Sequence, residues 1–344
     1  MITQLILARV ALLFIALLAL SAAFGQEKEK RIGSIDFFGY AGMNLDQIRS
    51  ALPIHKGELY PGPATTIDKI QQAIRSAIGQ MPTDVGPVCC DRDGNYLIFV
   101  GLPGESIRQT RFNPVPKGKA QLPVEILTLY EQTMDALSTA VSKGNAQEDT
   151  SKGYALSITD APLRTKQLAI RAYAIRHEPL IRAVLSSSSN TQQRVVAAHL
   201  LGYARQSRQQ IADLVHASHD SDEGVRNNAT RALGVLAESS AKVAAQIPAS
   251  GFIRMLSSGS WTDRNKAMWV ITTLTKSRDP KLLGELRSGA LVSLIEMARW
   301  QSSGHAYDAR ILLGRIAGID EKRLEQLAKE DNVEGIISAL PTRP

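Results

Sequence analysis

The chain has 344 residues, a length that predicts two domains. Its 40 basic and 33 acidic residues give a net charge of +7, and 44% of its residues are hydrophobic, as in ordinary globular proteins. Aromatic residues make up only 5% of the chain, which argues against a large β-sandwich or an aromatic nucleic-acid platform. The two cysteines exclude a disulfide-stapled scaffold and a cysteine-rich zinc or iron–sulfur site.

The first 25 residues have the pattern of a secretory signal peptide. Residues 10–20 form an uninterrupted apolar run, and small residues follow at 21–25. The apolar stretch is shorter than the roughly 18 to 20 residues that span a bilayer, so we expect cleavage after Gly25 and no stable membrane insertion afterwards. The prediction is a periplasmic or secreted protein without a nucleic-acid partner, and the alternative is an N-terminal membrane anchor.

Residues 31–103 predict a small α+β domain. Residues 32–39 alternate between apolar and other side chains, which indicates a half-buried strand. A short amphipathic helix follows Asn44, and we expect a second helix to begin after Thr65 as its cap and to end at Gly79.

Two extended runs complete this domain, at residues 85–90 and 96–100. Pro87 cannot donate a ladder hydrogen bond, so it predicts an edge position. The order strand, helix, helix, strand, strand resembles a POTRA domain. The resemblance implies a docking unit that binds partners by adding a strand to its sheet edge.

The two cysteines are adjacent, at positions 89 and 90. Neighbouring residues of a strand point to opposite faces of the sheet, so we expect one buried and one exposed thiol. In an exported protein a vicinal disulfide between Cys89 and Cys90 is the alternative.

Residues 104–123 contain three prolines, two glycines and several basic residues, which predict an extended linker. Beyond Pro123 the apolar pattern becomes helical, and we expect a helical-repeat domain over residues 124–340. A basic–x–x–Ala–x–x–x–Leu–Gly pattern recurs there, approximately, at residues 166–174, 194–202, 226–234, 264–272 and 306–314.

Second helices are expected between these motif helices, near residues 179–185, 209–217, 252–256, 281–300 and 321–328. This alternation is the pattern of a solenoid and resembles HEAT repeats of the short bacterial type. The resemblance implies that Asp222 caps a helix, Arg226 lies along the neighbouring repeat and Ala229 permits close helix packing. Ala306 and Thr272 depart from the pattern. The expected fold is therefore mainly α, a HEAT-like α-solenoid preceded by a small βααββ, POTRA-like domain.

No catalytic motif with proper spacing occurs in the sequence, and no cofactor is expected. His216, His219 and Asp220 are the nearest approach to a metal site, and they define the alternative hypothesis of a metal-dependent envelope enzyme.

The favoured hypothesis is a non-enzymatic scaffold that binds a protein or peptide of the cell envelope with its repeat surface. Tryptophan and arginine are enriched at binding hot spots, so we expect the contact residues to be Arg254, Trp261, Arg264 and Trp300.

Overall fold

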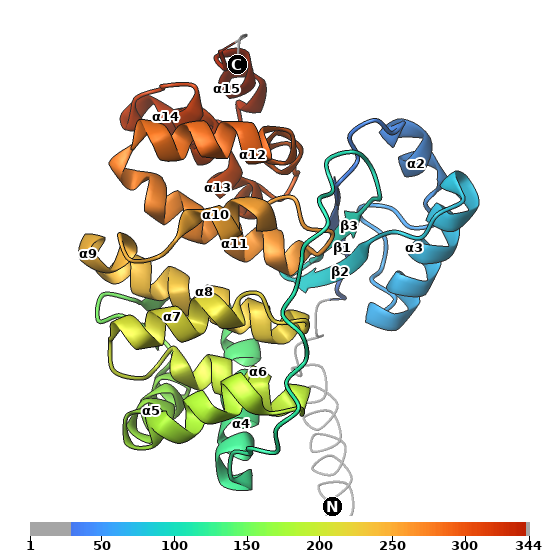
Figure 1. The fold of residues 1–344 in the computed structure, drawn as a ribbon. Helices are drawn as coiled ribbons and strands as arrows, with labels where there is room; N and C mark the ends of the chain where they lie inside the picture. The colour runs from blue at the N-terminus through green and yellow to red at the C-terminus, as the bar shows by residue number, and fades with distance from the viewer. Residues whose placement is uncertain (1–28, 342–344) are drawn as a thin grey trace, which may run out of the picture.

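The computed structural model describes residues 29–341, and in it a small α+β unit lies against one side of a long stack of helices (Figure 1). The predicted signal peptide, residues 1–25, lies outside the described residues. No helix in the described part of the chain is both long enough and apolar enough to cross a bilayer.

The α+β unit has the predicted order of elements: β1 (Ile32–Phe38), α2 (Leu45–Ala51), α3 (Pro63–Ile78), β2 (Asp84–Cys89) and β3 (Tyr96–Gly101). The strands are arranged in the order β1-β3-β2, with β1 parallel and β2 antiparallel to β3. Pro87 therefore lies on an edge strand, as predicted.

Two of the three expected helix boundaries in this unit are confirmed. The Asn44 side chain accepts a hydrogen bond from the Gln47 N–H, and Gly79 ends α3 in the left-handed conformation at φ 72°. The prediction that Thr65 caps α3 is wrong. The helix begins at Pro63, whose fixed φ suits a first helical position.

The two faces of the sheet belong to two different cores. Helices α2 and α3 cover one face, where Phe37, Val85, Ile98 and Val100 pack against helix residues such as Ile70. Phe38, Leu97 and Phe99 point to the opposite face and join the core of the helical stack. Because both faces are buried, β3 is an almost unbroken apolar strand.

Cys89 and Cys90 are joined in a vicinal disulfide, and the described residues contain no free cysteine. The expectation of two separate thiols is therefore wrong. Strand β2 ends at Cys89, so the alternation of faces along a strand does not extend to Cys90.

The regular elements after β3 are helices, apart from the two-residue strands β4 (Glu148–Asp149) and β5 (Leu156–Ser157). The helices are α4 (Val124–Ser142), α5 (Ala161–Ser187), α6 (Thr191–Leu201), α7 (Arg208–Ala217), α8 (Glu223–Ser239), α9 (Ala241–Ala244), α10 (Ala249–Met255), α11 (Trp261–Leu274), the 3₁₀ turn η1 (Thr275–Ser277), α12 (Pro280–Ala298), α13 (Ser303–Ile316), α14 (Glu321–Lys329) and α15 (Val333–Ser338).

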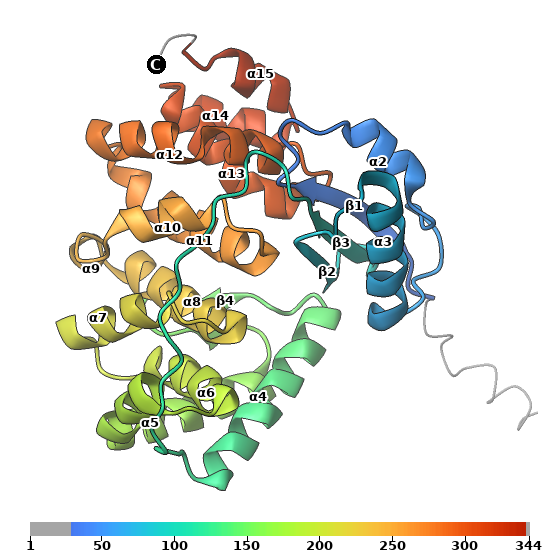
Figure 2. The ribbon, with the colours of Figure 1, turned by 45° about the vertical axis from the view of Figure 1, so that its right-hand side comes forward.

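The motif helices α6, α8, α11 and α13 stack on one another in chain order, and α5, α7, α10 and α12 pack beside them as their partners (Figure 2). In these four motif helices the small residue is completely buried, which permits this close approach: Ala197, Ala229, Ala267 and Ala309. The matching residue of the first motif, Ala169 on α5, is exposed, so the pattern fails there. A Cβ atom on Gly234 of α8 would lie 2.8 Å from the Trp269 ring of α11. The predicted helical-repeat solenoid is thus confirmed.

The first repeat differs from the prediction because its two helices are merged in α5. The helix is kinked at His177, which has non-helical φ and ψ of −118° and 22°, two residues before Pro179. Proline removes a helical hydrogen bond and clashes with the preceding turn, which accounts for the bend. The expected helix near residues 179–185 is therefore the second half of α5.

Candidate functional site

Two of the predicted contact residues, Trp261 and Trp300, lie beneath the sheet of the α+β unit. Trp300 is 2% exposed, and its indole Nε1–H donates to the Phe37 carbonyl oxygen at 2.8 Å. Trp261 is the first residue of α11, and its ring stacks on Phe99 with the centroids 4.8 Å apart. Both tryptophans thus contact the chain's own sheet in this structure.

Arg264 lies in the same interface, whereas Arg254 does not. The Arg264 side chain is completely buried, with its guanidinium carbon 4.8 Å from the centre of the Phe38 ring. Arg254 lies exposed on α10. The structure therefore brings together Trp261, Arg264 and Trp300 but separates them from Arg254. Contact of any of the four with a partner stays a prediction.

A buried carboxylate of the stack, Glu296 on α12, holds the loop after β1. It accepts hydrogen bonds from the Gly39 N–H at 2.7 Å, the Ala41 N–H at 2.9 Å and the Ser106 hydroxyl at 2.6 Å. The Arg264 guanidinium lies 3.5 Å away and balances the charge. The carboxylate is thereby satisfied at a place where an unpaired charge would be very costly.

Two carboxylates of the sheet reach into the stack in return. Asp36 accepts the Gln301 N–H at 2.7 Å and the Ser302 N–H at 3.1 Å, just before α13. Asp84 accepts the Trp261 N–H at 2.7 Å, at the start of α11, where the helix dipole favours negative charge. Burial raises the pKa of both carboxyls, that of Asp84 to about 6. We call Asp36, Asp84 and Glu296 the clamp carboxylates.

Sequence reasoning missed the clamp carboxylates. Asp36 alternates with apolar residues in its strand, a pattern that usually marks a solvent-facing side chain. Glu296 lies 257 residues from the Gly39 N–H that it accepts. The one local signal was the neighbourhood of Trp300, whose indole N–H needs a buried acceptor.

The arginines that open three of the repeat motifs form a ladder inside the stack. Each donates to the carbonyl oxygen six residues earlier: Arg194 to Ser188, Arg226 to Asp220 and Arg264 to Ser258. Each also pairs with a carboxylate further along the chain: Asp220, Asp263 and Glu296 in turn. The implied position of Arg226 along the neighbouring repeat is confirmed, because Asp263 belongs to α11.

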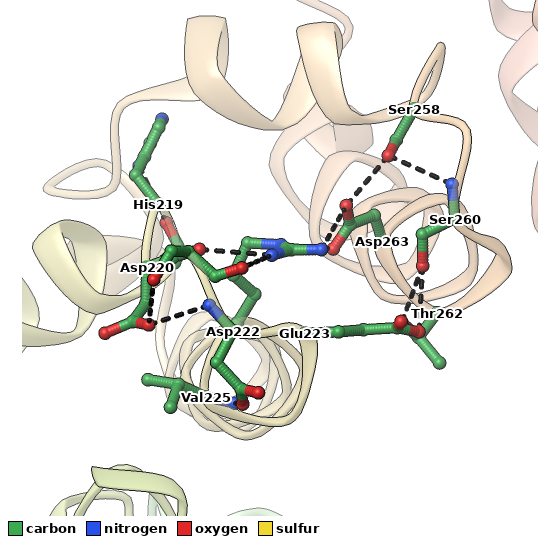
Figure 3. Close-up of polar contacts among 12 residues, drawn as sticks. His219, Asp220, Asp222, Glu223, Val225, Ser258, Ser260, Thr262 and Asp263 are labelled. Carbon is green, nitrogen blue, oxygen red and sulfur yellow. Dashed lines mark hydrogen bonds and ion pairs between the residues drawn. The ribbon is translucent and has the colours of Figure 1, made fainter. Parts of the chain in front are cut away.

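Figure 3 shows how the loops of two successive repeats are tied together around this ladder. Asp220 accepts the Asp222 N–H at 2.8 Å, and Asp222 caps α8 through the Val225 N–H. Asp263 also accepts the Ser258 hydroxyl at 2.8 Å. Arg226 and these carboxylates thereby tie the loop before α8 to the loop before α11.

The last motif, which has Ala306 in place of the arginine, uses a substitute one turn later. Arg310 on α13 donates to the Ala298 carbonyl oxygen at 3.0 Å and pairs with Asp331. Residues four apart lie on the same face of a helix, so Arg310 reaches the loop that an arginine at position 306 would reach.

The predicted linker, residues 104–123, is an extended strap that runs along the inter-helix loops from α10 to α4 (Figure 2). Every fifth N–H of the strap donates to a loop carbonyl: Arg108 to Ser257 at 2.9 Å, Asn113 to His219 at 2.7 Å and Gly118 to Ser187 at 2.7 Å. The three acceptors are equivalent, since each lies seven residues before a ladder arginine. The strap thus follows the repeat through equivalent backbone bonds, and at Gly118 a second bond is added because its carbonyl oxygen accepts the Ser189 N–H at 2.8 Å.

The strap also binds the stack through side chains. The Phe112 ring lies over the Arg226 guanidinium, 4.2 Å from its carbon, and the Leu122 N–H donates to the Gln193 side chain at 2.7 Å. A cation over an aromatic face is stabilised by the ring quadrupole.

His216 and His219, the histidines considered as metal ligands, lie next to Asn113 of the strap. The Asn113 amide lies 3.4 Å from His216 Nε2, and the His219 ring contacts the Val215 carbonyl oxygen. The Asp220 carboxylate is already used by Arg194 and its own loop. Among the described residues, no group of three or more His, Cys, Asp or Glu side chains is placed to hold a metal ion.

Three pockets lie at successive junctions of the repeats, and none of them is lined by the strap. The first, of about 560 Å³, is formed by α5 and Arg205. The second, of about 490 Å³, has apolar walls from Ile211, Val215 and Pro248. The third, of about 520 Å³, lies among α8, α9, α11 and α12 and has a floor of alanines. We call these three the pocket row.

No family model matches the sequence, and no curated protein matches it. Among solved structures, one similar chain is a designed armadillo repeat protein in complex with the peptide (KR)4. It is 17% identical, the match covers 64% of this chain and 92% of that chain, and the TM-score is 0.36. The likeness is coarse, and the helical stack is established by the helix contacts of this chain itself.

Proposed function

We propose that this chain is an exported, non-enzymatic scaffold that binds a protein or peptide of the cell envelope along its HEAT-like repeats. Export is supported by the apolar segment and small residues at the N-terminus. Binding is supported by the regular construction of the stack, in which the same ladder and the same loop bond recur.

The pocket row is the observation that carries the proposal. Pockets of about 560, 490 and 520 Å³ recur at three successive junctions, so this part of the surface presents a row of concavities. Repeat proteins bind extended partners along such surfaces, with one anchor side chain of the partner in each hollow. The walls of the second pocket are mainly apolar, which suits an aliphatic or aromatic anchor.

The POTRA-like unit has a docking role in this proposal. The clamp carboxylates fix its orientation on the stack. Strand β2 is an edge strand of the sheet, and edge strands accept an added strand from a partner. The scaffold would then hold two partners at a fixed distance.

Photo-crosslinking in the native envelope tests the proposal. A photoreactive residue at Ala212 or Ala245, in the second and third pockets, is expected to crosslink one and the same protein. Ala212→Arg and Ala245→Arg should each reduce recovery of that protein at least tenfold without changing the melting temperature.

A matched control keeps the result interpretable. Gln72→Arg introduces the same charge on the exposed face of α3, distant from the pockets, and should leave recovery unchanged. Crosslinking from neither pocket position, or equal recovery with all three variants, would contradict the proposed binding surface.

A further inference from the structure

The strap is an extended basic segment that is fixed to the surface of the stack. Its backbone is held there by hydrogen bonds at Arg108, Asn113 and Gly118. Four basic side chains of the strap are exposed: Arg108, Arg111, Lys117 and Lys119. The sequence contains no acidic residue between Glu105 and Glu125, so this charge is not balanced within the strap.

The stack does not balance the charge either. None of the four basic residues is in an ion pair among the described residues, whereas exposed arginines elsewhere, such as Arg49 and Arg299, have acidic partners. The acidic groups of the loops below are already occupied. Asp220 pairs with Arg194, Asp222 caps α8, and Glu223 accepts the Ser260 hydroxyl.

Two exposed apolar side chains, Phe112 and Val115, lie between these basic residues in the sequence of the strap. Phe112 is 38% exposed and Val115 is 51% exposed, and neither lines a pocket of the pocket row. The Phe112 ring covers the Arg226 guanidinium and is only partly exposed, whereas Val115 is half exposed on a strap whose backbone is bonded to the stack. An exposed line of basic residues with exposed apolar side chains among them is the composition of surfaces that bind at the headgroup level of anionic bilayers.

We propose that the strap is a peripheral membrane-binding surface, which docks the scaffold on anionic lipid headgroups. The four cations neutralise headgroup charge, and Val115, together with the exposed part of Phe112, contacts the boundary between headgroups and acyl chains. A lipid surface is favoured over an acidic protein because Val115 is half exposed among the four cations, and a protein partner would need a complementary hollow for it. Because this surface is distinct from the pocket row, the proposal stands or falls independently of the proposed function.

Vesicle cosedimentation tests the proposal on the chain from Gln26 to Pro344, which contains both hydrophobic cores. We expect binding to vesicles with 30% phosphatidylglycerol, little binding to pure phosphatidylcholine, and release at high salt. Each basic residue near an anionic surface contributes about fivefold in partitioning. The quadruple change of Arg108, Arg111, Lys117 and Lys119 to Gln should therefore weaken binding at least a hundredfold.

The matched control changes four exposed basic residues elsewhere to Gln: Lys69, Arg75, Lys281 and Lys322. It alters net charge equally but should retain most of the binding. Equal binding by the two quadruple variants, or no binding of the wild-type chain to any anionic vesicle, overturns the proposal, and the second result favours an acidic protein as the occupant.

A fluorescent probe locates the contact. A polarity-sensitive dye on Val115→Cys should shift to the blue with anionic vesicles, whereas the same dye on Leu59→Cys, at a side chain that is 53% exposed in the α+β unit, should not. A shift at position 59 alone contradicts the assignment of the membrane contact to the strap.

Discussion

The two faces of the three-stranded sheet both contribute to a hydrophobic core but differ in composition. The face under α2 and α3 is apolar, with Phe37, Ile98 and Val100. The face toward the stack combines Phe38 and Phe99 with Asp36 and Asp84. An apolar face can be covered by any well-shaped helix pair, whereas buried carboxylates need particular donors. The difference shows that the stack-facing side of the sheet fits one particular surface of the same chain, formed by the ends of α11, α12 and α13.

Among the substitutions that test this difference between the two faces, removal of the Glu296 carboxylate should lower the free energy of unfolding most. Glu296→Ala leaves three donors and the buried Arg264 guanidinium without their acceptor. We expect the free energy of unfolding to fall by about 3–5 kcal/mol, as measured by urea denaturation. Glu285→Ala, at an exposed position of the same helix, should change it by less than about 0.5 kcal/mol.

Trp300→Phe removes one hydrogen bond and part of a ring from the same face. The Phe37 carbonyl oxygen then lacks the indole N–H that it accepts at 2.8 Å. An unsatisfied buried acceptor costs about 1–3 kcal/mol, and we expect a loss of unfolding free energy in that range. No change in the urea midpoint would mean that the sheet is not seated on Trp300 in solution.

Asp84→Asn should change how stability depends on pH. Burial raises the pKa of Asp84 from 3.8 to about 6, so its charged form weakens the folded state above pH 6. This penalty disappears as the pH falls from about 6 toward 3.8, because the folded state then binds the proton more tightly than the unfolded state.

The Asn variant lacks this titration but keeps an oxygen that accepts the Trp261 N–H. Its stability relative to the wild type should therefore rise by about 1 kcal/mol between pH 4.5 and 7.5, discounted for the partial exposure of the group. Asp46→Asn, at an exposed site on α2, serves as the control. An unchanged difference between variant and wild type across this range contradicts the buried environment of Asp84.

The smallest effect is expected on the apolar face. Ile98→Val removes one methyl group from a fully buried side chain that packs against α2 and α3. The loss should be about 0.5–1.5 kcal/mol in urea denaturation. Combined with Glu296→Ala, it should be additive, because the two residues serve opposite faces. Strong coupling would show that the faces are not independent.

Local patterns predicted the elements well but not their assembly. Asn44, Gly79 and Asp222 act as the sequence indicates because caps depend on a few neighbouring residues. The stack was predictable because its small and basic residues recur with each repeat. The seating of the sheet was not predictable, because contacts such as that of Glu296 with Gly39 join residues 257 positions apart.

The candidate site was predicted only in part for the same reason. Tryptophan and arginine are as suitable for an internal interface as for an external one, and Trp261, Arg264 and Trp300 contact the sheet. The path of the strap was hidden because its bonds are made by backbone N–H groups, which leave no mark in the sequence beyond the absence of proline at positions 108, 113 and 118.

Calorimetric unfolding of the chain from Gln26 to Pro344 tests most directly whether the sheet and the stack form one body. The account predicts one cooperative transition, which Glu296→Ala moves to lower temperature as a whole. Two separate transitions in the wild-type chain, with Glu296→Ala affecting the helical one alone, would contradict it.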